Sequence, residues 1–296
     1  MTNLPPHGPD MACFDAVEYE LQQSLLDYPV SLPGWSVDRL LHQSNDTILY
    51  RAHYKNNKYA VIKRFNYQLS AMKDSHVHEF ISSVDAVKAI NCTGLVDIYN
   101  VGLSHNHFYI LMEYFKYDNL LNRISLVDDE IVISQRLEWF KSILMAVVAL
   151  HNEGLLHRDL KLSNIMFRED ELVLVDCGIA SGWMVKTGLI EEGSIYCTPA
   201  YVSPERAVSG VCNVQTEIYS LGVIFYELLT NIKPYNAPDS VSLIKMHVLA
   251  PIPILPEGVK HYQNILCRLL AKHPENRFHS VEAILWALKS IDAQIL

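Results

Sequence analysis

The spacing of apolar and polar residues divides the chain into parts with different predicted secondary structure. Between residues 35 and 65 apolar and polar positions alternate with the period of a strand, in three runs at 35–41, 48–53 and 59–65. Lysine and asparagine residues at 55–58 predict a polar turn between the last two runs. These runs predict a small antiparallel sheet early in the chain.

Further along, the apolar positions recur with the 3.6-residue period of a helix. The longest run covers 134–152, where Ser134 is the expected N-cap and Gly154 the expected stop. A second strongly apolar helix is predicted at 216–230, and one helix, 74–90, follows the predicted sheet. Further helices are expected near residues 239–249, 259–272 and 280–292.

A segment of different composition precedes the first strand. Residues 1–12 contain Pro5, Pro6 and Pro9 and are expected to be disordered. Residues 13–28 have apolar side chains at helical spacing and predict a short helix. The folded part of the chain is therefore expected to follow a partly ordered N-terminal extension.

A polar stretch interrupts the apolar pattern between residues 157 and 178. It carries Asp159, Lys161, Asn164 and Asp176, and two short apolar runs within it predict a hairpin with a charged turn at 168–171. Such a hairpin brings the four polar side chains to one end. This combination suits phosphoryl transfer from a metal-bound nucleotide, because one carboxylate and the amide can hold Mg²⁺ while the other carboxylate orients an attacking hydroxyl.

The same stretch carries the motifs of a known family. Residues 157–159 read His-Arg-Asp, and Asn164 follows at the distance required by the protein-kinase catalytic loop H-R-D-x-x-x-x-N. Residues 176–178 read Asp-Cys-Gly and stand where those kinases have D-F-G. From about residue 35 to its C-terminus the chain resembles the bacterial-type serine/threonine protein kinases.

The resemblance implies an α+β, two-lobed protein-kinase-like fold for residues 34–296. The small lobe, an antiparallel sheet with one regulatory helix, would cover 34–111, and a mainly helical large lobe would cover 117–296, with the hinge at 112–116. Residues 1–33 would form the extension. The implied activity is Mg²⁺-dependent transfer of the ATP γ-phosphoryl group to a serine or threonine hydroxyl of a protein substrate.

The family's functional residues carry over to the matching positions of this chain. Asp159 would orient the acceptor hydroxyl, while Lys161 and Lys63 would steady the charge of the transferred group. Asn164 and Asp176 would hold Mg²⁺. The ATP-binding positions that the resemblance implies are Ser44, Val61, Lys63, Met112, Glu113, Phe115, Asn119 (with Asp118 as the alternative at the ribose) and Met166.

One departure from the family pattern concerns the phosphates of the nucleotide. The connection between the first two predicted strands has His42, Ser44 and Thr47 where the family has glycines. Side chains at these positions keep the backbone N–H groups farther from the phosphates, so weak ATP binding for a kinase is expected.

A second departure concerns the helix at 74–90. In the family this helix supplies a glutamate that pairs with the strand lysine, which is Lys63 here, but the matching position holds Ser83. Glu79 lies one turn earlier on the same face and is the expected substitute partner; otherwise the ion pair is absent. Cys177 replaces the family's phenylalanine and is expected to leave less apolar contact.

The second half of the chain carries positions that stabilise the family's fold. Glu217 stands where the family has an aspartate that braces the catalytic loop, and its longer side chain still has the reach for that contact. Arg277 is expected to pair with Glu205. Thr198, in the substrate-docking segment, and Lys161 are typical of serine/threonine rather than tyrosine kinases.

The activation loop, residues 179–205, carries the acidic residues Glu191 and Glu192 near the position where bacterial relatives carry a phosphothreonine. A carboxylate there would imitate part of the phosphate's charge. Phosphorylation of Thr187 or Ser194 is the competing explanation for how this loop is ordered.

The net charge and the cysteine content limit the possible binding partners and the expected cellular compartment. The net charge of −9 argues against a nucleic-acid binder. The six cysteines are scattered without a C-x-x-C pair, which favours free thiols in the cytoplasm. Neither an apolar run long enough for a membrane span nor a secretory leader is expected, while delivery by another route stays open. The protein substrate and the oligomeric state are open.

Two other functions remain open at this point. A pseudokinase, acting as a nucleotide-binding or scaffolding module, is favoured by the missing glycines and the displaced glutamate. It is opposed by the four intact positions Lys63, Asp159, Asn164 and Asp176, which such a module does not need for chemistry. A third possibility is an ATP-using transferase with a non-kinase product.

Overall fold

The chain forms two compact units in a computed structural model. Of the described residues, the small unit contains those up to 66 together with 97–114, and the large unit contains 74–96 and those from 115 onward. The described residues are 30–55, 58–66, 74–125, 132–178 and 198–295. The short helix expected at 13–28 and the acidic pair expected to imitate a phosphate lie outside them.

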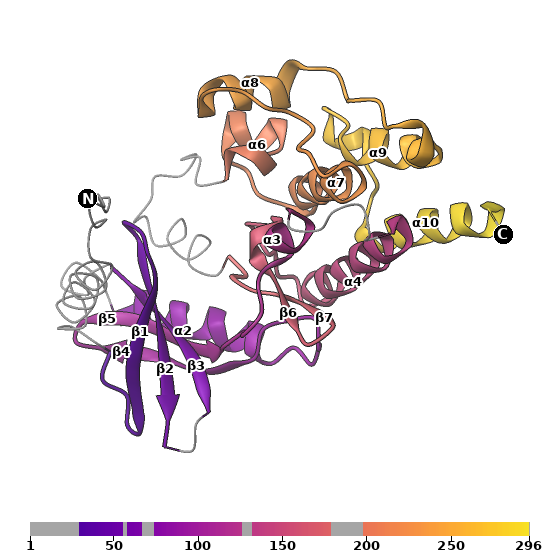
Figure 1. Cartoon of the computed structure of the whole chain (residues 1–296). Helices are drawn as coiled ribbons and strands as arrows, with labels where there is room; N and C mark the ends of the chain where they lie inside the picture. Colours follow the sequence, from indigo (N-terminus) through magenta and orange to yellow (C-terminus); the bar gives the residue numbers. More distant parts are fainter. Residues whose placement is uncertain (1–29, 56–57, 67–73, 126–131, 179–197, 296) are drawn as a thin grey trace, which may run out of the picture. The chain divides into compact units, whose positions relative to one another are not determined.

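The small unit contains one antiparallel sheet with the strand order β1-β2-β3-β5-β4 (Figure 1). The three strands predicted from the alternating pattern are confirmed, each within a few residues. The strands are β1 (Trp35–Gln43), β2 (Thr47–Tyr54), β3 (Tyr59–Phe65), β4 (Ile98–Ser104) and β5 (His107–Glu113).

Alternation along the strands builds the core of the small unit. On β2 the side chains of Ile48, Tyr50 and Ala52 are buried, and the residues between them are more exposed. On β3, Ala60 and Ile62 face the same cluster. Because strand neighbours point to opposite faces, Val61 and Lys63 lie on the other face of the sheet.

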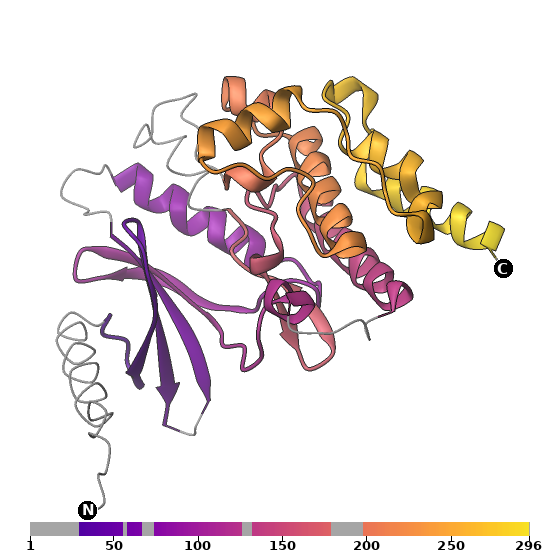
Figure 2. The same cartoon turned by 45° about the horizontal axis from the view of Figure 1, so that its top comes forward.

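The large unit is mainly helical and contains one hairpin (Figure 2). Its α-helices are α2 (Asp74–Lys88), α3 (Leu120–Ser125), α4 (Ile133–Asn152), α6 (Pro204–Ser209), α7 (Val214–Thr230), α8 (Ser240–Leu249), α9 (Gln263–Leu269) and α10 (Val281–Ile295). The hairpin consists of β6 (Ile165–Arg168) and β7 (Glu171–Leu174). In the described part of the unit, short 3₁₀ turns cover Leu162–Asn164, Pro199–Tyr201, Glu257–Tyr262 and Pro274–Asn276.

Helix α7 is the centre of this unit, and all its residues from Thr216 to Leu229 are buried. The rings of Phe140 on α4 and Phe225 on α7 lie 4.7 Å apart between centroids. Gly222 allows close approach on another side, since a Cβ there would lie 2.8 Å from the Cβ of Leu269 on α9. Helix α7 therefore connects α4 with α9 through direct side-chain packing.

The predicted long helix α4 is confirmed, but its predicted cap is wrong. The helix begins at Ile133 with Val132 as N-cap and has no side-chain capping bond. Ser134 therefore lies inside the first turn. At the other end the helix stops after Asn152, and Gly154 takes a left-handed φ of 69°, which a glycine adopts without strain.

The segment that follows α2 is tied to the hairpin of the large unit. Leu174 on β7 donates its N–H to the carbonyl of Gly94 at 2.8 Å and accepts from Val96 at 3.0 Å. These bonds explain why α2 groups with the large unit, whereas the sequence assigned it to a small lobe at 34–111. The expected lobe and hinge boundaries stay predictions.

Candidate active site

The polar stretch after α4 forms a loop that leads into β6. Leu160 and Leu162 are buried with at most 3 % exposure, whereas Asp159 and Lys161, which alternate with them along the chain, remain partly accessible. The apolar pair therefore fixes the backbone of the loop, while the polar side chains point away from the core. The hairpin predicted to follow is confirmed, with Arg168 and Glu171 paired at its charged turn.

Asp159 is the centre of a hydrogen-bond network in this loop. Its Oδ1 accepts a bond from the Thr198 hydroxyl at 2.8 Å. Its Oδ2 accepts from the Asn164 amide at 3.0 Å and forms an ion pair with Lys161 Nζ at 2.6 Å. Three donors thus hold the carboxylate of Asp159 in one orientation.

Lys161 and Thr198 also contact each other. Lys161 Nζ donates to Thr198 Oγ1 at 3.1 Å, so these two residues and Asp159 form a closed triangle of polar contacts. Thr198 lies just before the turn Pro199–Tyr201, which the sequence assigned to substrate docking. The structure therefore joins the segment that is predicted to dock the substrate to the carboxylate of Asp159.

Asn164 and Asp176 are connected through the backbone. Val175, next to Asp176, donates its N–H to the Asn164 carbonyl at 2.9 Å. The Asn164 side chain donates from its amide nitrogen to the carbonyl and the carboxylate of Asp159. These bonds orient the amide of Asn164 through its nitrogen. Its oxygen is the kind of ligand atom that binds a hard cation such as Mg²⁺.

Buried His157 links the loop to the segment that carries Asp176. Its Nε2 lies 3.1 Å from the carbonyl of Val175, and its Nδ1 accepts from the backbone N–H of Asp159 at 3.4 Å. Burial lowers the pKa of His157, although the negative charges of Glu217, Asp159 and Asp176 oppose this shift. A neutral ring protonated on Nε2 satisfies both contacts.

Glu217 on α7 braces the loop, and the expected reach of its longer side chain is confirmed. One carboxylate oxygen accepts the backbone N–H of Arg158, and the other lies 2.7 Å from Nε2 of His151. The side chain is only 3 % exposed. The sequence did not predict the contact of Glu217 with His151, which lies at the end of α4.

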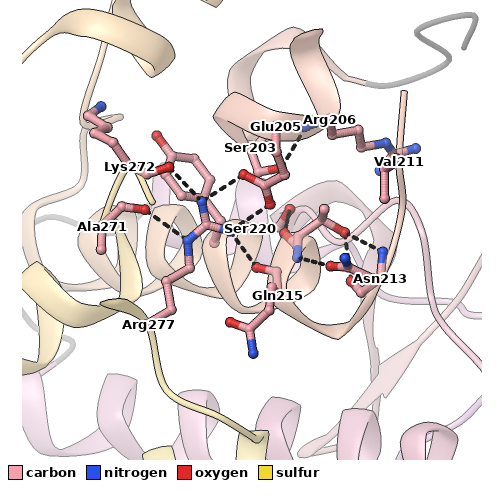
Figure 3. A network of polar contacts seen from close by, with 12 residues as sticks. Ser203, Glu205, Arg206, Val211, Asn213, Gln215, Ser220, Ala271, Lys272 and Arg277 are labelled. Atoms are coloured by element: carbon pink, nitrogen blue, oxygen red, sulfur yellow. Dashed lines mark hydrogen bonds and ion pairs between the residues drawn. The ribbon is translucent and has the colours of Figure 1, made fainter. Parts of the chain in front are cut away.

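The predicted pair of Arg277 and Glu205 is also confirmed (Figure 3). Its two nitrogen–oxygen distances are 2.7 and 2.8 Å, and Arg277 donates further to the carbonyls of Ala271 and Gln215. Burial on its own raises the pKa of Glu205, but the hydrogen bonds and charge of Arg277 lower it. The pair anchors the start of α6.

The small unit holds another group of predicted site residues. Lys63 lies on β3 opposite Ile110, and Val61 lies opposite Met112, so these residues belong to adjacent strands. Glu113 ends β5 and donates its N–H to the carbonyl of Asp97 at 2.9 Å.

Ser44 lies in the turn between β1 and β2, where the family has glycines. Its Oγ accepts the N–H of Thr47 at 3.1 Å, and its own N–H donates to the Thr47 carbonyl at 2.9 Å. From the end of β3, Asn66 donates to the carbonyls of Ser44 and Asn45. Side-chain hydrogen bonds thus stabilise the turn. The sequence did not predict the contacts of Asn66 with it.

In the large unit the structure brings Asn119 and Met166 together. They form an isolated antiparallel bridge between the start of α3 and β6. The Asn119 side chain accepts the N–H of Asn122 at 2.9 Å and so caps α3, which gives this residue a structural contact in addition to its predicted place at the ribose. Phe115 belongs to the same unit. The ATP-binding roles of these residues stay predictions.

These features define a protein of the protein-kinase class: a five-stranded antiparallel sheet in one unit and, in a helical unit, a catalytic loop followed by a hairpin. The chain belongs to the protein kinase domain family, whose model matches residues 46–286. A solved structure, that of a mutant PknI kinase domain from Mycobacterium tuberculosis, shares the fold with a TM-score of 0.66 at 18 % identity, covering 89 % of this chain and 97 % of that one.

Its curated relatives include bacterial serine/threonine-protein kinases. A probable kinase of Clostridium acetobutylicum is 27 % identical over 257 residues, which is 85 % of this chain and 38 % of the relative. PrkC of Bacillus subtilis is 27 % identical over 226 residues, 75 % of this chain and 34 % of PrkC. PknB of Mycobacterium leprae is 31 % identical over 201 residues, 65 % and 32 % respectively. The chain spans about a third of the length of these curated relatives.

Proposed function

We propose that the chain is an ATP-dependent serine/threonine protein kinase. The observation that carries this proposal is the polar triangle of Asp159, Lys161 and Thr198, with distances of 2.6 to 3.1 Å. A carboxylate held by a lysine and a threonine hydroxyl beside the docking segment is arranged to orient a hydroxyl acceptor. The kinase relatives support the same conclusion, and none of these findings favours the scaffolding alternative.

In the proposed reaction Asp159 orients the hydroxyl of a serine or threonine in a protein substrate. The bond between the γ-phosphorus and its bridging oxygen breaks, a bond to the acceptor oxygen forms, and the hydroxyl proton passes to the carboxylate. Lys161 supplies positive charge close to Asp159, as its 2.6 Å ion pair indicates. Positioning and electrostatics supply most of the rate.

We assign the binding of the nucleotide to the positions that match the family's motifs. Lys63 would contact the phosphates, and Val61 and Met166 would pack against the two faces of the adenine ring. Met112 would be the gatekeeper residue, and backbone groups of Glu113 and Phe115 would bind the edge of the ring. Asn119 would face the ribose, with Ser44 at the phosphate loop. These assignments rest on the match to the family's motifs.

The donor set of Asn164 and Asp176 fits Mg²⁺, which prefers oxygen ligands and binds proteins through few carboxylates together with substrate phosphates. The amide oxygen of Asn164 is oriented by the two bonds of its nitrogen. When bound, the ion neutralises phosphate charge.

We further propose that the domain works in the cytoplasm. Cys92, Cys212 and Cys267 are free thiols, which favours a reducing compartment. Among the described residues, no helix has the length and apolar character that crossing a bilayer requires.

The test is phosphotransfer from labelled ATP with Mg²⁺ to peptides that differ only in a serine, threonine or tyrosine acceptor. Wild type should label the serine and threonine peptides, and Asp159→Asn and Asp176→Asn should each lower the rate by about 10²–10⁴-fold. Asp170→Asn, at an exposed position of the nearby turn, is the matched control. Unchanged rates in both site variants would refute the proposal, and so would labelling of the tyrosine peptide alone.

A further inference from the structure

Arg158, the residue directly before Asp159, has an unusual backbone conformation. Its φ is 66°, in the left-handed region that residues other than glycine rarely adopt. A conformation of this kind persists when surrounding contacts determine it. The contacts of its two peptide groups therefore decide how the chain enters Asp159.

Charged side chains from two different helices bind these two groups. The N–H of Arg158 donates to Glu217 on α7. The carbonyl of Arg158 accepts a hydrogen bond from Nη1 of Arg206 on α6 at 2.6 Å. Hydrogen bonds with a charged partner are stronger than neutral ones, so both ends of the left-handed residue are firmly held.

The backbone from which Arg206 extends is itself fixed. Ser203 caps α6, and its Oγ accepts the N–H of Arg206 at 3.3 Å (Figure 3). The next residue back along the helix, Glu205, is bound by both terminal nitrogens of Arg277. Arg206 thus reaches the catalytic loop from an anchored turn.

The contact acts on the peptide that joins Arg158 to Asp159. That peptide contains the carbonyl bound by Arg206 and the N–H of Asp159, and the peptide bond is planar, so fixing one group fixes the other. Thr198, whose hydroxyl holds the Asp159 carboxylate, lies in the segment that leads into α6. Helix α6 therefore connects the docking segment with the backbone and the side chain of the catalytic loop.

We propose that Arg206 is a positioning residue for phosphotransfer: it sets the orientation of the Arg158–Asp159 peptide and couples it to the acceptor-docking segment. The inference rests on the proposed kinase function for its effect on rate. It is distinct from the brace by Glu217, since Arg206 binds the carbonyl and comes from another helix.

The test compares wild type with Arg206→Gln, Arg206→Lys and the control Lys245→Gln. Lys245 is an exposed cation on α8 of the same unit, so the control removes a charge without touching the loop. Two measurements are made well below the melting temperature of each protein: kcat and KM for ATP and an acceptor peptide, and amide hydrogen exchange of residues 156–164. The exchange measurement does not depend on catalysis.

Arg206→Gln should lower kcat by about tenfold or more while KM for ATP changes by less than about twofold, because a charge-assisted hydrogen bond of the loop is lost. Exchange at 156–164 should become faster. Arg206→Lys, which keeps a charged donor, should recover part of kcat, and Lys245→Gln should match wild type.

The proposal is overturned if Arg206→Gln keeps the wild-type kcat and exchange, or if it lowers only the melting temperature. It is also overturned if Arg206→Lys is no better than Arg206→Gln. An inactive wild type whose exchange responds to Arg206→Gln as expected would refute the kinase function while supporting the positioning contact.

Discussion

The backbone of the catalytic loop in the large unit and that of the β1–β2 turn in the small unit are fixed by different kinds of contacts. Both hold backbone that the family positions close to a nucleotide or an acceptor. The catalytic loop is fixed by partners distant in sequence, such as Glu217 and Arg206. The turn is fixed largely by its own side chains, Ser44 and Thr47, and by Asn66 of the neighbouring strand.

The difference indicates where this chain tolerates departures from the family pattern. In the catalytic loop the replacement of aspartate by Glu217 keeps the brace, because the longer carboxylate still reaches Arg158 and also contacts His151. In the turn, side chains stand where the family has glycines. They fill space near the expected phosphates, and their hydrogen bonds use backbone N–H groups of the turn. We therefore expect a competent catalytic loop combined with a loose hold on ATP.

The largest loss of stability is expected when the buried charge pair of the large unit is broken. Arg277→Met should lower the free energy of unfolding by about 3–5 kcal/mol, because Glu205 is then left without its cationic partner. Urea denaturation measures the change. Arg268→Met, on neighbouring α9, serves as control.

The pH dependence of the same pair has a defined sign. The pKa of Glu205 is lowered in the folded protein, so its contribution is present above the ordinary carboxyl pKa of 4.5 and is lost as the pH falls through the lower folded value. Wild type should therefore lose stability below about pH 4.5 more steeply than Arg277→Met. Equal slopes for the two proteins would mean that the pair is not the source of the shift.

The next effect concerns the brace of the catalytic loop. Glu217→Ala should cost about 2–3 kcal/mol of stability, since it leaves the Arg158 N–H and His151 without their buried acceptor. Phosphotransfer should fall as well. Glu217→Gln keeps one acceptor oxygen and should lie between alanine and wild type; a glutamine variant as damaged as alanine would show that the negative charge matters more than the hydrogen bond.

His247 on α8 gives a smaller, pH-dependent effect. Burial and the charge of Lys272 lower its pKa to about 4, and its Nδ1 lies 3.0 Å from the hydroxyl of buried Tyr219. The unfolded chain binds this proton near the ordinary pKa of 6.5, so stability is present above 6.5 and is lost as the pH falls toward 4. We expect a loss of about 1–3 kcal/mol across this window.

Thermal unfolding between pH 7 and pH 4 checks the effect of His247. His247→Gln should flatten the curve, whereas His273→Gln, at an exposed position, should follow wild type. Buried His157, whose pKa is also lowered, contributes in the same direction and remains in both variants. A variant curve as steep as that of wild type would assign the loss to other groups.

The smallest effect on stability is expected in the β1–β2 turn. Restoring glycines with Ser44→Gly and Thr47→Gly should change stability by less than about 1 kcal/mol, because the lost bonds are exposed. ATP affinity should rise by up to about tenfold if backbone contacts to the phosphates become possible. Calorimetry with Mg-ATP measures the change, with Ser36→Gly on exposed β1 as control; unchanged affinity would show that these side chains do not limit phosphate binding.

Local sequence patterns predicted much of the fold and part of the candidate active site. Alternation predicted β1 to β3, and helical spacing predicted α4 and α7. The resemblance to the kinase family implied the contacts of Glu217 and Glu205. The predicted cap at Ser134 was wrong, because a serine one residue inside a helix looks like a cap in sequence.

Two contacts near the candidate site, each between residues far apart in the chain, were not predicted. Arg206 and Arg158 are 48 residues apart, and His151 and Glu217 are 66 apart. Neither pair belongs to the motifs that carry the resemblance, and tertiary packing alone brings these residues together. The ion pair of Lys63 with Glu79 stays a prediction, because the two residues belong to different units.

The most direct test of the account is one series of initial rates with Mg-ATP for wild type and Asp176→Asn, together with calorimetry of both proteins. The account predicts saturable, Mg²⁺-dependent turnover of wild type, with a KM for ATP in the upper part of the usual range of about 1 μM to 1 mM. Asp176→Asn should remain folded and lose this turnover. Turnover that does not depend on Asp176, or a wild-type dissociation constant for ATP below about 1 μM, would contradict it.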